Sequence, residues 1–177
     1  QRQMCIRDRF SNGLKGTVKA MNVLVTGGAG YIGSHACVEL QQQGHGVVIV
    51  DSLCNSDASV VERIGRITGT APVFVQADIR DRPRMAALMQ EHAIDAVLHF
   101  AALKSVGESQ KIPLQYFDSN ISGSIALLGA MQDAGVQLLV FSSSATVYGN
   151  QDHCPVAETA STCAMTPYGR TKLVVEQ

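Results

Sequence analysis

Several features are scarce in this 177-residue sequence, and each scarcity excludes a class of protein. Aromatic residues make up only 5%, and no apolar run approaches the roughly 20 residues that a membrane span needs. We therefore expect no membrane partner. A formal net charge of -1 provides no broad basic surface, so nucleic acid is not an expected partner either. The five cysteines are scattered without a Cys-x-x-Cys pair, which predicts neither a disulfide framework nor a metal site and favours the cytoplasm.

The two ends of the chain differ from its middle. Residues 1–20 hold five basic side chains and one acid, and they lack the apolar segment of a signal peptide. A mitochondrial transit helix is the alternative, but Gly13 and Gly16 interrupt its periodicity. We predict a non-native or disordered leader at 1–20 and a nucleotide-binding domain at 21–177. A helix expected from Pro167 is still running at Gln177, so we expect that domain to be incomplete, with little activity alone and a C-terminal substrate domain absent.

From Met21 onward, short apolar runs alternate with stretches of helical period. Strands are predicted at 22–26, 46–51, 73–77, 95–100 and 136–142, and their continuous apolar character is typical of strands buried on both faces. Helices are predicted at 31–43, 83–92 and 113–134. Their expected buried faces are, in chain order, Ile32, Ala36 and Leu40; Met85, Leu88 and Met89; Ile121, Ile125 and Leu128. This alternation of strands and helices predicts an α/β fold with a doubly wound parallel sheet of the Rossmann type.

A glycine-rich loop joins the first strand to the first helix. It contains Gly27, Gly28, Gly30 and Gly33, and glycine at such positions permits a tight turn, a close approach of pyrophosphate and close helix packing. Asp51 ends the second strand 18 residues after Gly33, where a carboxylate can bind ribose hydroxyls and repel the 2′-phosphate of NADP. NAD is therefore the expected cofactor. The alternatives are a glycine turn without a ligand and an acid that merely caps a strand.

A tyrosine and a lysine lie four residues apart near the end of the chain. Tyr168 and Lys172 share one helical face, and a nearby ammonium lowers the pKa of a phenol enough for acid–base work. Ser144, in the serine-rich run after the fifth strand, could bind the same substrate oxygen. We predict Tyr168, Lys172 and Ser144 as catalytic residues, with Tyr168 and Ser144 also binding substrate. A structural surface pair is the alternative for Tyr168 and Lys172.

Six short blocks of the sequence, in the order in which they occur along the chain, resemble the extended short-chain dehydrogenase/reductases, and among them the sugar-nucleotide epimerases. The blocks are residues 26–35, 51–56, 78–80, 100–109, 142–149 and 167–172. The resemblance implies transient NAD-dependent oxidation at sugar C4, which interconverts UDP-glucose and UDP-galactose. It implies that the NAD site includes, besides the glycines, Asp51, Tyr168 and Lys172, the residues Tyr31, Ile32, Ser52, Leu53, Cys54, Asn55, Ser56, Asp78, Ile79, Phe100, Ala101, Ala102, Leu103, Lys104 and Ser119.

One departure, one discriminating pair of residues and three alternatives bear on this resemblance. Ser119 stands where the family usually has asparagine, so one nucleotide contact is expected to change. Ala145 and Thr146 stand where dehydrating relatives carry an acidic pair, which favours epimerisation over loss of water. Another sugar-nucleotide epimerase or a dehydratase remains an alternative, as does a non-catalytic NAD-binding regulator. The resemblance also implies a UDP-sugar partner and a homodimer formed through 113–134.

Overall fold

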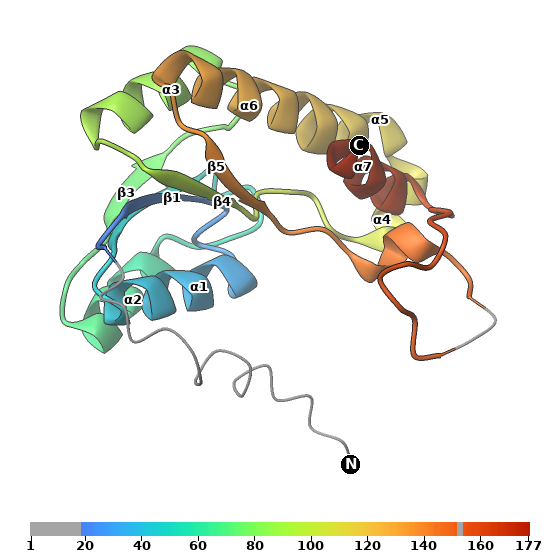
Figure 1. The fold of residues 1–177 in the computed structure, drawn as a ribbon, viewed down its shortest axis with the longest axis horizontal. Helices are drawn as coiled ribbons and strands as arrows, with labels where there is room; N and C mark the ends of the chain where they lie inside the picture. Colours follow the sequence, from blue (N-terminus) through green and yellow to red (C-terminus); the bar gives the residue numbers. More distant parts are fainter. Residues whose placement is uncertain (1–18, 152–153) are drawn as a thin grey trace.

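A single parallel sheet organises the chain. The computed structural model describes residues 19–151 and 154–177, so nearly all of the predicted leader lies outside the described residues. The strands are β1 (Asn22–Thr26), β2 (Gly46–Asp51), β3 (Val73–Gln76), β4 (Ala96–His99) and β5 (Leu138–Phe141). They are arranged in the order β3-β2-β1-β4-β5 with every neighbouring pair parallel (Figure 1). The doubly wound α/β fold predicted from the sequence is confirmed.

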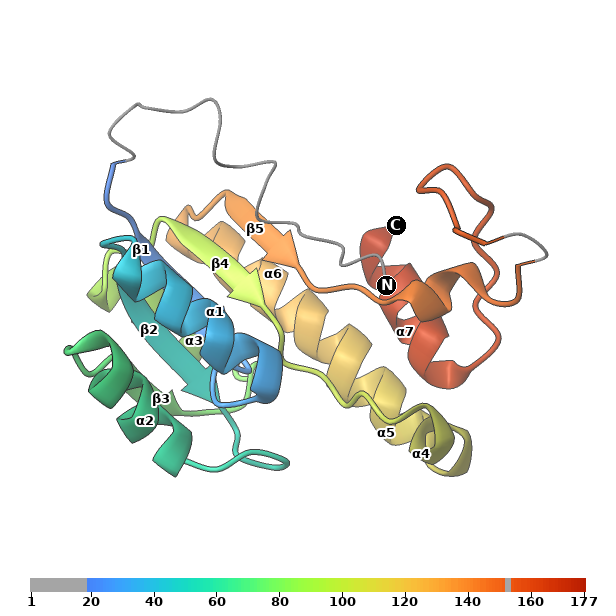
Figure 2. The ribbon, with the colours of Figure 1, turned by 90° about the horizontal axis from the view of Figure 1, so that it is seen from below.

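Helices cover both faces of this sheet, as Figures 1 and 2 show. α1 (Tyr31–Gln42) and α2 (Ser59–Thr68) pack on one face, and α3 (Arg82–Glu91) and α6 (Gly123–Ala134) pack on the other. Side chains of a strand point alternately to the two faces. In β1, Val23 and Val25 join the cluster beneath α1 and α2, whereas Leu24 joins the cluster beneath α3 and α6. Burial on both sides explains why these strands read as continuous apolar runs.

The predicted buried face is right for α3, wrong for α6 and partly right for α1, where Leu40 packs against the core but Ile32 does not. Met85, Leu88 and Met89 of α3 are buried as expected. In α1 the buried residues are Gly33 and Cys37, while Ile32 is 58% exposed. The apolar pattern misassigned this face because a glycine, with no side chain, makes the closest contact with the neighbouring backbone.

The predicted helix 113–134 is three consecutive segments. α5 (Pro113–Phe117) leads into a π-helical turn (Asp118–Ser122) and then into α6. Ile125 is 65% exposed and Leu128 44% exposed, so the predicted face is the outer one. The inner face carries the polar residues Asn120 and Ser124 ahead of Leu127. Because two buried positions are polar, an apolar pattern selected the stripe one residue further along the chain.

The remaining elements lie in segments that the sequence left without assignment. They are α2, α4 (Val106–Lys111) and a short 3-10 helix (Ala145–Tyr148). A final helix, α7 (Pro167–Glu176), forms where the sequence predicted one. In Figure 2, α4, α5 and α7 lie together beyond the ends of β4 and β5. Within residues 19–151 and 154–177, no helix has both the length and the apolar character to cross a membrane.

Candidate functional site

A cavity of about 740 Å³ opens at the carboxyl ends of the parallel strands. This is where open α/β sheets bind ligands, and the volume lies within the range of small-molecule sites. It is lined by most of the residues predicted for the cofactor: Gly27, Gly30, Tyr31, Ile32, Gly33, Asp51, Ser52, Cys54, Asn55, Ser56, Asp78, Ile79, Phe100, Ala101, Ala102, Leu103, Lys104, Ser119, Tyr168 and Lys172. The structure thus brings together residues that are distributed over most of the sequence.

The glycine loop crosses from β1 to α1 with its backbone packed against neighbouring backbone. Gly27 has φ +70°, and a Cβ there would lie 2.6 Å from the Ala101 nitrogen. A Cβ on Gly33 would lie 2.3 Å from the Gly27 carbonyl oxygen. A side chain at Gly33 would push α1 away from the glycine loop, and one at Gly27 would push that loop away from the segment after β4. The close approach leaves the amino end of a 12-residue helix at the cavity, where unpaired N–H groups and the helix dipole favour an anion.

Asp51 lies buried at the end of β2, at 6% exposure, beside that helix end. Its Oδ2 accepts a hydrogen bond from the backbone N–H of Ala29 at 3.0 Å. Its Oδ1 accepts from the Leu53 N–H at 2.9 Å and from the Ser56 hydroxyl at 2.8 Å. The carboxylate is therefore fixed by the glycine loop on one side and by the loop after β2 on the other. Leu53, with φ +60°, supplies this backbone contact, and its side chain does not line the cavity.

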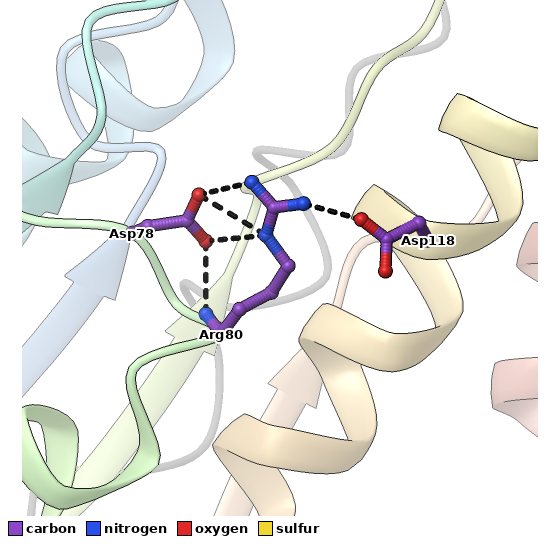
Figure 3. Close-up of polar contacts among 3 residues, drawn as sticks. All are labelled: Asp78, Arg80 and Asp118. Carbon is purple, nitrogen blue, oxygen red and sulfur yellow. Dashed lines mark hydrogen bonds and ion pairs between the residues drawn. The ribbon is translucent and has the colours of Figure 1, made fainter.

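An arginine lies between two aspartates beyond β3 (Figure 3). All three residues line the cavity. The Arg80 side chain donates to both oxygens of Asp78, and its other terminal nitrogen donates to Asp118 of the π-helical turn. The Arg80 guanidinium lowers the pKa of Asp78 below its usual range, mainly through these hydrogen bonds. Arg80 and Asp118 were not predicted as site residues. They are 38 residues apart, and no local pattern indicates that they meet.

We expect Arg80→Gln to raise the pKa of Asp78 toward its ordinary value, because the variant loses the charged donor. The stabilisation from Asp78 is present above the ordinary aspartate pKa and disappears as pH falls through the lowered value. Both side chains are more than 40% exposed, so the loss in free energy of unfolding at pH 7 should stay within about 1 kcal/mol. Carbon-13 NMR titration of the aspartate carboxyls measures the change.

A similar pair outside the cavity provides the control. Arg82 donates to both oxygens of Asp133 at 2.7 Å and lowers the pKa of that carboxyl in the same way. Arg82→Gln should therefore raise the pKa of Asp133 and leave that of Asp78 unchanged. An unchanged Asp78 titration in Arg80→Gln would contradict the assigned cause.

Tyr168 and Lys172 reach the opposite end of the cavity from α7. The Thr166 hydroxyl caps this helix by accepting from the Gly169 N–H at 3.1 Å. Tyr168 is 9% exposed and Lys172 is 4% exposed, and both line the cavity. Their burial, in the same cavity as the glycine loop and Asp51, argues against an exposed structural pair.

The Lys172 ammonium is held by the end of β5. Its Nζ donates to the Ser142 carbonyl oxygen at 2.8 Å and lies 4.6 Å from the centroid of the Phe141 ring. Burial lowers the pKa of Lys172 from 10.5 to about 8. Near neutral pH this lysine is still mostly protonated, although it can lose its proton far more readily than a surface lysine.

Ser144 is placed differently from the sequence prediction. Its hydroxyl lies 2.9 Å from the Thr146 hydroxyl and accepts from the Thr146 N–H, which caps the 3-10 helix. Ser142 and Ser143 line the cavity, whereas Ser144 does not. The serine run did signal this region, but local turn geometry decides which of its members faces the cavity. Its substrate-binding role remains a prediction.

Asn120, which the sequence did not single out, connects the cavity wall to α7. Its side-chain oxygen accepts from the Leu103 N–H at 2.9 Å, and its amide donates to the Leu103 carbonyl and the Thr171 hydroxyl. Ser119 beside it lines the cavity. Asn120 therefore supports the wall next to the predicted catalytic helix.

The fold and the cavity define a dinucleotide-binding domain of the Rossmann class with a tyrosine–lysine pair at one end. Residues 23–177 match the NAD dependent epimerase/dehydratase family. The chain belongs to this family. The family resemblance inferred from the motifs is thus confirmed, and so is NAD as the cofactor.

Curated relatives and solved structures agree with this assignment. The chain is 52% identical over 158 residues to the UDP-glucose 4-epimerase of Yersinia pestis, covering 89% of this chain and 47% of the relative. It is 54% identical to a Klebsiella pneumoniae UDP-glucose 4-epimerase sequence over 78% of this chain and 99% of that sequence. The crystal structure of UDP-glucose 4-epimerase from Bifidobacterium longum in complex with NAD+ and UDP superposes with a TM-score of 0.86 at 43% identity, covering 88% of this chain and 47% of that one. The chain thus spans about half the length of the Yersinia and Bifidobacterium proteins.

Proposed function

We propose that NAD binds along the carboxyl edge of the sheet, with its two halves on opposite sides of the glycine loop. The amino end of α1 is suited to the pyrophosphate because its N–H groups and dipole favour an anion. The buried Asp51 carboxylate is suited to the adenosine ribose hydroxyls and disfavours a 2′-phosphate. The Asp78 region would receive the adenine, and Tyr168 and Lys172 would face the nicotinamide half. The continuous lining of the cavity supports this orientation.

We propose that the protein containing this chain interconverts UDP-glucose and UDP-galactose. The observation that carries the proposal is the burial of Tyr168 and Lys172 in the same cavity as the glycine loop and Asp51. When bound, NAD supplies reversible oxidation at the sugar C4 and is regenerated in each cycle. Relatives named UDP-glucose 4-epimerase, at about half identity, support the choice of sugar.

Tyr168 removes the proton from the sugar 4-hydroxyl and later returns it to the 4-keto oxygen. The Lys172 ammonium on the next turn of α7 stabilises the phenolate electrostatically and is positioned to bind the nicotinamide ribose hydroxyls. Ser144, one residue beyond the serines that line the cavity, would orient the same sugar oxygen. That role requires the Ser144 hydroxyl to exchange its Thr146 partner for the substrate.

Loss of water is disfavoured by the residues that follow the serine run. Dehydration needs a general acid and a base beside the sugar, but Ala145 and Thr146 carry neither. They form the first turn of the 3-10 helix after Ser144, and in the described residues of that turn no carboxylate is present. Besides the reversible oxidation that bound NAD would supply, epimerisation needs only the acid–base transfer of one proton, which Tyr168 provides.

The outer stripe of α5 and α6 supports the proposed homodimer. Leu114 is 81% exposed, Ile125 65% and Leu128 44%. Apolar stripes of this kind on a helix are typical of helix–helix contacts between subunits. We propose a UDP-sugar and a second copy of the protein as partners, and the cytoplasm as the location.

The reaction can be tested in a chimera. Residues 21–177 of this chain are joined to the remaining half of the Yersinia pestis relative, and UDP-galactose is supplied without added NADH. We expect conversion to UDP-glucose with no net release of reduced cofactor. A chimera that binds NAD and UDP-galactose but forms no UDP-glucose would contradict the proposed reaction. Formation of a dehydrated 4-keto sugar would favour the alternative chemistry.

A further inference from the structure

The buried Lys172 ammonium has one hydrogen-bond acceptor and one aromatic face as its partners. The acceptor is the Ser142 carbonyl oxygen at 2.8 Å, and the aromatic face belongs to Phe141, whose ring centroid lies 4.6 Å from Nζ. Across residues 19–151 and 154–177, no aspartate or glutamate forms an ion pair with this lysine. A buried cation without a carboxylate needs another source of stabilisation, and the negative face of an aromatic ring can supply it.

The Phe141 ring is itself held in place by His99, its register partner on the neighbouring strand β4. The His99 ring packs against it with centroids 5.6 Å apart and an interplanar angle of 37°. His99 is fixed at both nitrogens, with Nδ1 2.7 Å from the Thr26 hydroxyl and Nε2 2.9 Å from the Ser124 hydroxyl. Burial, and to a lesser extent the Lys172 charge, lowers the pKa of His99 to about 4. The histidine is therefore neutral near pH 7 and does not repel the lysine.

We propose that Phe141 is a positioning residue, whose ring face holds the Lys172 ammonium charged and in place beside Tyr168. The proposal rests on the proposed function, because there Lys172 is the group that supports the phenolate of Tyr168. Phe141 lies at the end of β5 and does not line the cavity, so it acts through Lys172 and not on a ligand.

Other ionisable groups around α7 are engaged elsewhere. In α4 and α5, Glu108 accepts a hydrogen bond from the Tyr116 hydroxyl at 2.7 Å, and Lys111 makes no ion pair among the described residues. Asp118 of the π-helical turn pairs with Arg80. Tyr148 of the 3-10 helix, and Arg170 and Glu176 of α7 itself, form no hydrogen bond with the Lys172 amine within the described chain. Near neutral pH His99 is uncharged, and Tyr168 is the ionisable side chain one helical turn before Lys172 on α7. The ring and the Ser142 carbonyl are thus the groups that offset burial of the charge.

Replacing Phe141 site-specifically by phenylalanines of increasing fluorination tests the proposal. Fluorine withdraws electron density from the ring face while the shape of the side chain is nearly preserved, so folding and packing should persist. The 177-residue chain is labelled with carbon-13 lysine, the Lys172 resonance is assigned with Lys172→Arg, and its side chain is titrated by NMR. We expect the pKa of Lys172 to fall stepwise with fluorination, corresponding overall to about a tenfold rise in the ratio of neutral to charged amine at a given pH.

Two conventional variants form a matched pair. Phe141→Leu removes the aromatic face and should lower the pKa of Lys172 to a similar degree, whereas Phe141→Tyr keeps the face and should leave it nearly unchanged. A Lys172 titration that does not respond to fluorination would overturn the proposal. So would equal effects of the leucine and tyrosine variants. The titration needs neither NAD nor a sugar, so its outcome is independent of whether the proposed epimerisation is observed.

Discussion

Tyr168→Phe should slow the conversion of UDP-galactose by about 10²- to 10⁴-fold, which is the usual contribution of a positioned acid–base group. The variant keeps the aromatic ring, which is only 9% exposed, and loses the hydroxyl that removes the sugar proton. We expect the fold and NAD affinity to change little, because the hydroxyl is lost without a change in ring packing. The effect should therefore appear in kcat. It is measured in the chimera described above, with NAD binding followed separately.

Tyr148→Phe provides the control for this substitution. Tyr148 ends the 3-10 helix and does not line the cavity, so removal of its hydroxyl should leave the rate within a few-fold of the unmodified protein. An unchanged rate in Tyr168→Phe would show that another group serves as the base. Equal losses in both variants would point to a general disturbance of the serine loop and α7.

The parts of the site that the sequence predicted are those determined by local spacing and by the order of strands in a parallel sheet. Gly33 is required by a backbone contact with Gly27, and Gly27 by a contact with the backbone that follows the neighbouring strand β4. Asp51 follows from the length of one strand–helix–strand unit, because the carboxyl end of β2 must lie beside that of β1 in a parallel sheet. Local spacing and sheet topology together are sufficient to place these groups in one cavity.

The parts that the sequence missed depend on contacts between distant segments. The inner face of the π-helical turn and α6 could not be read from apolar spacing, because Asn120 and Ser124 are buried there with polar partners on other elements. The contact of Arg80 with Asp118 likewise requires the packing of the β3–α3 connection against the helix that follows α5. Side-chain polarity predicts exposure only when no distant partner satisfies the polar group.

The same reasoning explains why the sequence alone could not predict whether the Lys172 side chain is buried or exposed. A lysine four residues after a tyrosine can lie on a surface or in a core, and the helical spacing is identical in both cases. The structure places it at 4% exposure, with its charge supported by one carbonyl and one ring. A charge held under such conditions costs folding free energy, which is a common property of functional sites.

Lys172→Met should consequently stabilise the fold while removing the group that supports Tyr168. Burial lowers the pKa of Lys172 from 10.5 to about 8, so in this interval the unfolded chain binds more protons than the folded chain. The free energy of unfolding of the unmodified protein should therefore rise as pH increases from about 8 to about 10.5, and the penalty is fully present below pH 8. At 1.36 kcal/mol for each tenfold step, that penalty is about 3 kcal/mol. The variant leaves the Ser142 carbonyl without its donor, which offsets about 1–2 kcal/mol, so we expect a net gain of about 1–2 kcal/mol at pH 7.

Urea denaturation of the Lys172→Met variant at pH 7 and pH 10 should show the gain in stability shrinking at the higher pH. The control Lys111→Met, on the exposed side of α4, should change the free energy of unfolding at neither pH. A loss of stability that is equal at both pH values would contradict the assigned penalty and would mean that the charged lysine contributes to folding as well as to the site.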